Sequence, residues 1–84
     1  MYFVYIIRNE KGKHYIGITT EVKQRLQQHN SHSNRSTKYK GPWELIYQEE
    51  FGNKKEALIR EKIIKAYKGG NAFKKLLRRG VRAV

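Results

Sequence analysis

The stretch YFVYIIRNEKGKHYIGI, residues 2–18, decides how the rest of the chain can fold. Residues 2–7 form an unbroken apolar and aromatic run, which is typical of a strand covered on both faces and is too short for a helix. Asn9 and Gly12 then stand where a three-residue hairpin loop with a left-handed bulge residue needs them. We therefore predict that residues 14–18 return as a second, antiparallel strand.

The length of this loop fixes which side chains share a face of the sheet. A three-residue loop pairs Tyr5 with Gly17 and puts Tyr5 and Tyr15 on one face, whereas a two-residue loop would put these tyrosines on opposite faces. Gly17 has no side chain and would leave open space in front of Tyr5. An isolated glycine inside a strand often marks such a close approach.

A helix over about residues 21–30 should follow the second strand, with Thr19 or Thr20 as its N-cap. Arg25 and His29 lie four residues apart in it and are therefore neighbours on the helix surface. Both border its narrow apolar stripe, so they should face inward or sideways. A guanidinium and an imidazole beside the phenols of the strands could together hold a phosphate group.

The rest of the chain contains three further predicted elements. They are a third strand over 43–49, a helix over 54–67 and a short amphipathic helix over 71–79, after a basic loop over 31–41. Asn53 and Asn71 are the expected N-caps of the two helices. The order β-β-α-β-α-α indicates an α+β fold in which helices flank a small three-stranded antiparallel sheet. We expect one domain over residues 1–84.

Glu61 is the least expected residue of the helix over 54–67, because it falls in the middle of an apolar face. A carboxylate in such a position is costly unless it is paired or coordinated. An ion pair with Arg25 or Lys65 would satisfy it, and so would ligation of a magnesium ion. The helix has a second apolar face, which should pack elsewhere and consists of Ile59, Ile63, Ala66 and Tyr67.

The composition points to a polyanionic partner. The 84 residues include 19 Lys and Arg against seven Asp and Glu, a formal charge of +12, whereas a small domain is typically soluble with a net charge of about 2 to 8. Nucleic acid is the usual partner of basic charge at this density. Lys38 and Lys40 flank Tyr39 in the basic loop and, with Arg35 and Lys65, are candidates for phosphate contacts and base stacking.

Other classes of protein are excluded by what the sequence lacks. Without cysteine there can be no disulfide and no thiolate metal site, and three histidines without a close pair give no zinc signature. We expect His14 and His32 at the surface. No apolar run approaches the roughly 20 residues of a membrane span, and no signal-peptide pattern is present. We therefore expect a cytoplasmic monomer with no membrane contact and an open, shallow site.

Tyr5, Tyr15, Arg25 and His29 each have a structural and a catalytic interpretation. A strand tyrosine is often a core residue with a solvated hydroxyl, but a cation beside it would favour the phenolate, which could take a proton from a water attacking phosphorus. Arg25 is either an exposed helix charge or a fork that holds two phosphate oxygens. His29 is either a cation at the helix end or a group that orients water or donates to a phosphate oxygen.

Taken together, these residues resemble the GIY-YIG nuclease family, in particular its small stand-alone bacterial members. The segment FVY at residues 3–5 matches the first half of the family's name, and YIG at residues 15–17 matches the second. Arg25, His29 and Glu61 follow in the family's order. The match of all five motifs is more specific than that of the two name motifs alone, and it extends over most of the chain, from about Tyr2 to Lys65.

The resemblance implies a three-stranded antiparallel sheet and metal-dependent hydrolysis of phosphodiester bonds in nucleic acid, with DNA favoured over RNA. It casts Tyr5, Tyr15 or both as base or water-positioning group, Arg25 as phosphate stabiliser and Glu61 as ligand of one Mg²⁺ or Mn²⁺ ion. His29 matches only those relatives with a histidine four residues after the arginine. Relatives commonly take their specificity from an attached domain, so we expect recognition of structure with little sequence specificity, or a protein partner that supplies the target.

Three positions depart from the family pattern. Phe3 replaces the first glycine of the motif, and we expect its side chain to join the core. Ile18 stands where some relatives carry a lysine. Asn71 lies near the place of an asparagine that many relatives have after the glutamate helix.

Two main functions therefore fit the sequence. One is a metal-dependent endonuclease, and the other is a non-catalytic nucleic-acid-binding module, such as an accessory factor for repair or ribonucleoprotein assembly. Both predict salt-dependent binding, but only the first predicts that Glu61→Ala abolishes metal binding and cleavage. A protein-interaction adaptor, whose charge only aids solubility, is a third interpretation and predicts no nucleic-acid binding at low salt.

Overall fold

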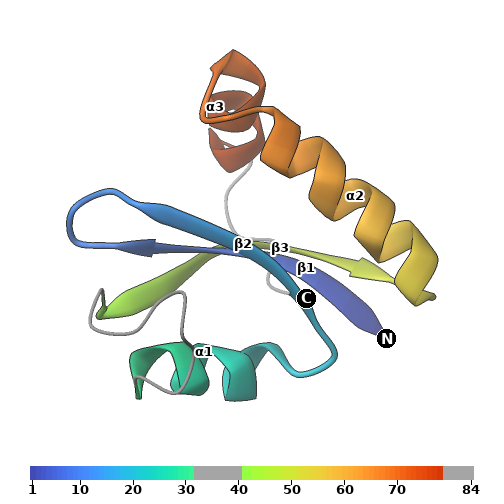
Figure 1. The fold of residues 1–84 in the computed structure, drawn as a ribbon, viewed down its shortest axis with the longest axis horizontal. Helices are drawn as coiled ribbons and strands as arrows, with labels where there is room; N and C mark the ends of the chain where they lie inside the picture. The colour runs from blue at the N-terminus through green and yellow to red at the C-terminus, as the bar shows by residue number, and fades with distance from the viewer. Residues whose placement is uncertain (32–40, 79–84) are drawn as a thin grey trace.

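The computed structural model describes residues 1–31 and 41–78 and folds them into one sheet with helices on both sides (Figure 1). In chain order the elements are β1 (Tyr2–Asn9), β2 (His14–Thr19), α1 (Val22–Asn30), β3 (Trp43–Phe51), α2 (Lys54–Ala66) and α3 (Asn71–Arg78). This order and the antiparallel sheet confirm the α+β fold expected from the sequence. The strand β3 ends at Phe51, beyond the predicted residue 49.

The hairpin between β1 and β2 has the predicted loop and register. Asn9 N donates to Lys13 O at 3.0 Å, and Gly12 has a φ of 80°, the left-handed conformation that a bulge glycine supplies without strain. The Asn9 side chain closes the loop, because its Oδ1 accepts hydrogen bonds from the backbone N–H groups of Lys11 and Lys13. Tyr5 consequently pairs with Gly17, as predicted.

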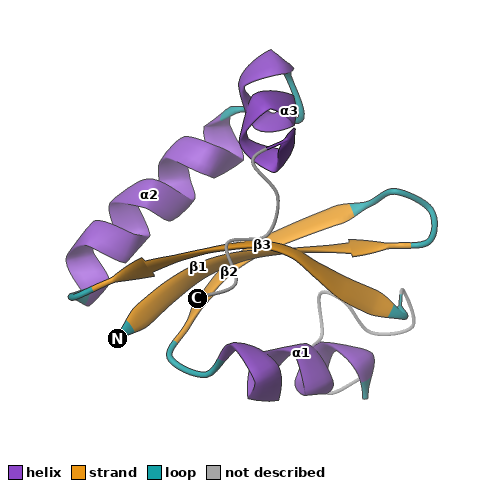
Figure 2. Ribbon diagram, turned by 180° about the vertical axis from the view of Figure 1, so that it is seen from behind, coloured by secondary structure: helices purple, strands orange, loops and turns teal. Residues whose placement is uncertain are grey.

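The sheet has the strand order β2-β1-β3 and separates two layers of helix (Figures 1 and 2). The helix α1 covers one face, and α2 and α3 cover the other. Because neighbouring residues of a strand point to opposite faces, β1 contributes to two cores. Val4 and Ile6 are buried towards α2 and α3, whereas Tyr5 and Ile7 are buried towards α1 with Trp43.

A β-bulge in β3 changes which of its side chains face α1. Ile6 pairs with Tyr47 and Ile7 with Leu45, so one residue, Ile46, is extra on β3. Leu45 belongs to the core beneath α1, whereas Tyr47 belongs to the core beneath α2. Beyond the bulge, the odd-numbered residues therefore face α2 and the even-numbered ones face α1.

The helix α2 is fixed to β3 by a charged contact. Arg60 Nε donates to Glu49 Oε1 at 3.0 Å and Arg60 Nη2 donates to Glu49 Oε2 at 3.0 Å, a bidentate pair on largely covered side chains. Tyr47 also donates a hydrogen bond to Glu49. Burial, and then the Glu49 carboxylate, raises the pKa of Tyr47 to about 12. Arg60 precedes Glu61, so this contact holds the helical turn that carries Glu61.

The predicted helix ends are correct in part. Asn53 caps α2, because its Oδ1 accepts from Glu56 N at 2.9 Å. Neither Thr19 nor Thr20 is the N-cap of α1; Glu21 occupies that position, and Thr19 Oγ1 accepts a hydrogen bond from Glu21 N instead. The threonine thus stabilises the turn before the helix rather than the helix itself.

Two further expectations for the last helices are wrong. Asn71 does not cap α3 but is its first residue, and Lys74 N donates to Gly70 O. Most of the second apolar face of α2 does not pack, since Ile59 and Ile63 are 52% and 42% exposed and Ala66 is exposed as well. Of this face, Tyr67 packs against the core. Among the described residues, no helix is both long and apolar enough to cross a membrane.

Candidate functional site

Three rings meet on the α1 side of the hairpin, and each comes from a different element. The Tyr5 hydroxyl of β1 lies 2.8 Å from Nε2 of His29, which α1 supplies. Tyr15 of β2 lies against the same histidine, with 4.8 Å between ring centroids, and 6.3 Å from the Tyr5 ring. The two tyrosines share a face because Tyr5 pairs with Gly17, as the length of the hairpin loop predicts.

Gly17 makes room for Tyr5. A Cβ atom at this position would stand 2.6 Å from the Tyr5 hydroxyl oxygen and 2.8 Å from the adjacent ring carbon. Both distances are shorter than any tolerable contact, so the phenol lies directly over the glycine backbone. The close approach predicted from an isolated strand glycine is confirmed.

Burial divides the roles of the two tyrosines. Tyr5 is 2% exposed, and burial, with smaller contributions from Tyr15 and Glu61, raises its pKa well above the usual value despite the charge of Arg25. Tyr5 therefore stays a neutral phenol bonded to the imidazole. Tyr15 is partly exposed and remains open to solvent or substrate.

His29 is fully buried. Sequence reasoning placed it only at the border of an apolar stripe. The interpretation as a cation at the helix end is wrong, because burial and then Arg25 lower its pKa. The helix is held in place by Asn30, whose Oδ1 accepts from Trp43 N at 2.6 Å and whose Nδ2 donates to Trp43 O at 3.0 Å. Sequence reasoning missed Asn30, because its partner lies 13 residues further along the chain.

Arg25 sits one helical turn before His29 and is partly exposed. Its Nη1 donates to Gln28 Oε1 at 3.4 Å, and both residues line a hollow of about 190 Å³ together with Thr20 and Glu21. The charge of Arg25 contributes to the lowered pKa of His29, second to burial, and opposes the raised pKa of Tyr5. The guanidinium is thus close to both rings and still accessible to an anion. Gln28 was not predicted, although its spacing from Arg25 is a usable signal.

Glu61 approaches this site from the other helix layer. Its side chain is 16% exposed and lies 3.5 Å from Lys65 Nζ, one of the two partners considered from the sequence. Its negative charge also helps to raise the pKa of Tyr5, which places the carboxylate within electrostatic reach of the phenol. Lys65 keeps 55% of its side chain exposed and can still contact a phosphate.

The residues present fit a single hard cation held mainly by water. Across residues 1–31 and 41–78, no three His, Asp or Glu side chains cluster as an all-protein metal cage would require. Magnesium commonly takes one or two carboxylates and completes its octahedron with water and phosphate oxygens. The largely covered carboxylate of Glu61 satisfies that requirement, whereas a zinc site would need more ligands.

Other residues predicted from the sequence are either outside the described residues or at the surface. Arg35, Lys38 and Lys40 lie outside the described residues, as does His32. His14 is exposed, as predicted, although its ring contacts Phe73 edge-on at 5.0 Å between centroids.

Because His29 is buried, we expect the folded protein to become less stable as the pH falls. Burial and then Arg25 lower the pKa of His29, so the unfolded chain takes up this proton at a higher pH than the folded chain. The melting temperature should therefore fall as the pH decreases below about 6.5, the ordinary histidine value. His29→Gln should make this decline shallower in melting curves from about pH 5 to 8.

His14→Gln is the matched control. Burial and Arg8 lower the pKa of His14 as well, so this residue contributes a decline of the same sign. The two variants measured in one series separate the contributions. If the melting temperature of His29→Gln fell as steeply with decreasing pH as that of the unsubstituted chain, the interpretation of His29 as a neutral, buried residue would be contradicted.

Several known proteins are similar to this chain. The model of the GIY-YIG catalytic domain matches residues 1–75. A UPF0213 protein of Staphylococcus epidermidis is 42% identical over 67 residues, which are 79% of this chain and 82% of that protein. A UPF0213 protein of Staphylococcus aureus is 40% identical over 67 residues, with the same coverage.

The fold also matches an experimental structure. The solution NMR structure of a UPF0213 protein from Bacillus halodurans is 31% identical and has a TM-score of 0.54. The match covers 94% of this chain and 84% of that chain. The arrangement of the sheet and helices is therefore shared with an experimentally solved relative.

Proposed function

Because this chain belongs to the GIY-YIG catalytic domain family, a nuclease superfamily, we propose that it is a metal-dependent endonuclease that hydrolyses phosphodiester bonds. The substrate is nucleic acid, with DNA favoured over RNA, recognised by structure more than by sequence. The observation that carries the proposal is the convergence of two tyrosines, a histidine and an arginine on one face of the hairpin, with a carboxylate in electrostatic reach.

Arg25 is the phosphate-binding group of this mechanism. Its guanidinium is accessible in the hollow beside α1 and has only one weak side-chain hydrogen bond, at 3.4 Å, among those described. A planar fork of N–H donors can hold two phosphate oxygens and stabilise the charge that grows on them as the phosphorus is attacked. Lys65 lies beside Glu61 and can contact a neighbouring phosphate.

Tyr15 is the better candidate for activating water. Tyr5 is buried, hydrogen-bonded to His29 and held neutral, so it can orient but not readily accept a proton. In its phenolate form, Tyr15 takes a proton from the attacking water. The water oxygen bonds to phosphorus as the bond to the leaving oxygen breaks, and solvent protonates the leaving group.

Tyr5 and His29 act on Tyr15 as positioning residues. The buried Tyr5–His29 pair presents the imidazole ring to Tyr15 and fixes the ring's angle. Glu61 would hold one Mg²⁺ or Mn²⁺ ion, which supplies charge stabilisation at the phosphate oxygens. A protein partner that supplies the target is also part of the proposal.

One observation favours a second function. Lys65 Nζ lies 3.5 Å from the Glu61 carboxylate and neutralises part of its charge without a metal. The same site could then hold phosphate without cleaving it, as in a non-catalytic nucleic-acid-binding factor for repair or ribonucleoprotein assembly. The formal charge of +12 is compatible with both functions.

A substrate panel separates the two functions. We expect the full chain to cleave some members of a set of single-stranded, flapped and branched DNA and RNA molecules in the presence of Mg²⁺ or Mn²⁺. Chelation by EDTA should abolish cleavage while salt-sensitive binding persists. Binding without cleavage of any substrate would favour the second function, and no binding at low salt would contradict both.

A further inference from the structure

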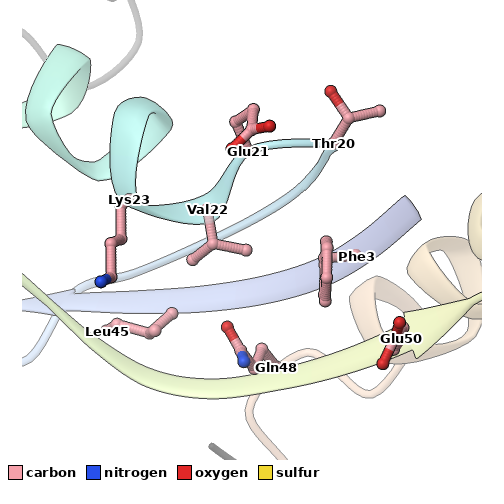
Figure 3. Close-up of a pocket in the computed structure, with 8 residues that line it drawn as sticks. All are labelled: Phe3, Thr20, Glu21, Val22, Lys23, Leu45, Gln48 and Glu50. Atoms are coloured by element: carbon pink, nitrogen blue, oxygen red, sulfur yellow. The ribbon is translucent and has the colours of Figure 1, made fainter. Parts of the chain in front are cut away.

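A groove of about 560 Å³ lies on the same side of the sheet as α1, between the start of that helix and β3 (Figure 3). Its lining combines an apolar surface with a few polar groups. Phe3 of β1, Val22 of α1 and Leu45 of β3 supply the apolar part, and Gln48 and Glu50 of β3 line it as well. This combination and volume are typical of a small-molecule or base-binding site.

The β-bulge creates the polar edge of the groove. Without the extra residue Ile46, strict alternation along β3 would turn Gln48 and Glu50 towards α2. With it, Gln48 stands opposite Tyr5 and Glu50 opposite Phe3, on the face that carries the tyrosines. The two polar side chains therefore line the groove next to an aromatic ring.

Phe3 is the position at which the chain departs from the family motif. We expected its side chain to join the core, and this is wrong, because Phe3 is only partly covered and faces the groove. A glycine at this position, as in the family motif, would leave the groove without an aromatic ring. The aromatic surface of the groove is thus a property of this chain's sequence, and an exposed aromatic ring is what an unpaired base stacks on.

The charge of the groove indicates which part of a nucleic acid it takes. Only seven of the 84 residues are acidic, yet Glu21 and Glu50 both line this groove, with Lys23 as the one cation among its lining residues. Glu21 also lines the hollow of Arg25, so Glu50 is the carboxylate that belongs to this groove alone. A carboxylate repels a phosphate, and it accepts a hydrogen bond from the exocyclic amine of cytosine.

The groove also lies next to the hollow that holds Arg25. The hollow that holds Arg25 and the Phe3 groove share Thr20 and Glu21, the turn before α1. The two therefore lie on either side of one turn, where neighbouring groups of one strand could occupy both.

From these observations we propose that the groove is a subsite for one unpaired base with an exocyclic amino group. The base stacks on Phe3, and Glu50 accepts a hydrogen bond from its amine. This inference rests on the proposed function, because it assumes that the chain binds nucleic acid at Arg25. It adds a preference for cytosine over uracil at one position near the bound phosphate.

Two oligonucleotides that differ only at this group test the subsite. The full chain is titrated, in EDTA to prevent cleavage, with fluorescent 12-residue oligodeoxycytidine and oligodeoxyuridine, whose bases present an amine and a carbonyl respectively at the same ring position. We expect about tenfold tighter binding of the cytosine probe. Glu50→Gln should remove or reverse this preference, because its amide can donate to the carbonyl.

Two further variants complete the experiment. Glu44→Gln changes another exposed carboxylate of β3 and should leave the preference intact. Phe3→Leu should weaken both probes by the same factor, with a melting curve to verify folding. Equal binding of the two probes, or a preference that survives Glu50→Gln, would overturn the subsite. If the chain cleaves members of the substrate panel but shows no preference for the cytosine probe, the subsite alone is overturned. If it binds no nucleic acid at all, the proposed function is overturned as well.

Discussion

Glu61→Gln is expected to lower the rate of metal-dependent cleavage by at least about a hundredfold while changing nucleic-acid affinity in EDTA by little. The substitution keeps the size of the side chain and removes its charge. A bound metal ion typically contributes several kcal/mol of charge stabilisation to the transition state, and each 1.36 kcal/mol is about a factor of ten in rate. The measurement is single-turnover cleavage of the best substrate of the panel.

Two control variants make the result specific. Glu10→Gln changes an exposed carboxylate in the hairpin loop and should leave the rate unchanged. Lys65→Met removes the ammonium that lies 3.5 Å from Glu61 and competes with a metal ion for the carboxylate. This variant should therefore reach half-maximal cleavage at a lower Mg²⁺ concentration than the unsubstituted chain. A Glu61→Gln rate equal to that of the unsubstituted chain would remove Glu61 from the mechanism.

The part of the site that the hairpin positions could be predicted from the sequence, because turn chemistry acts over a few residues. Asn9 and Gly12 select the loop, the loop selects the register, and the register puts Tyr5 over Gly17. Each step depends on residues close in sequence. The pairing of facing tyrosines therefore follows from local rules.

The contribution of α1 and of β3 could not be predicted in the same way. The complete burial of His29 depends on how α1 docks, which the Asn30–Trp43 hydrogen bonds across 13 residues help to set. The facing of Gln48 depends on a bulge at Ile46, and β3 shows no glycine that would mark one. Long-range docking and irregular pairing leave little trace in a local pattern.

The helix α2 shows where a periodicity argument is incomplete. The projection around Glu61 predicted an apolar face of Ala57, Leu58 and Ile64. Ala57 and Ile64 are fully buried, whereas Leu58 is 38% exposed. It also predicted a second packed face, yet Ile59 and Ile63 are exposed. Periodicity indicates which residues share a face, but the number of available partners decides how many faces are covered.

Gly17→Ala is expected to lower the free energy of unfolding by about 1 to 3 kcal/mol, the usual cost of overpacking a filled site. The new Cβ would stand 2.6 Å from the Tyr5 hydroxyl, which is buried and hydrogen-bonded to His29 and so has no free direction in which to move. Displacing the ring breaks that hydrogen bond and moves the imidazole against Tyr15. Cleavage should therefore fall by about a hundredfold, since misplacement by 1 Å has effects of that size.

A double-mutant cycle decides whether Tyr5 is the cause. Tyr5→Leu removes the hydroxyl oxygen and both ring carbons that would stand within 3.0 Å of the new Cβ, so Gly17→Ala should cost measurably less in the Tyr5→Leu background than alone. Gly52→Ala is the matched control, because nothing lies within 4 Å of a Cβ at that glycine and its stability should not fall. Urea denaturation of the four members of the cycle gives the coupling energy. Equal costs in both backgrounds would mean that Gly17 is required by the backbone of β2, and that the phenol's position over it is incidental to the site.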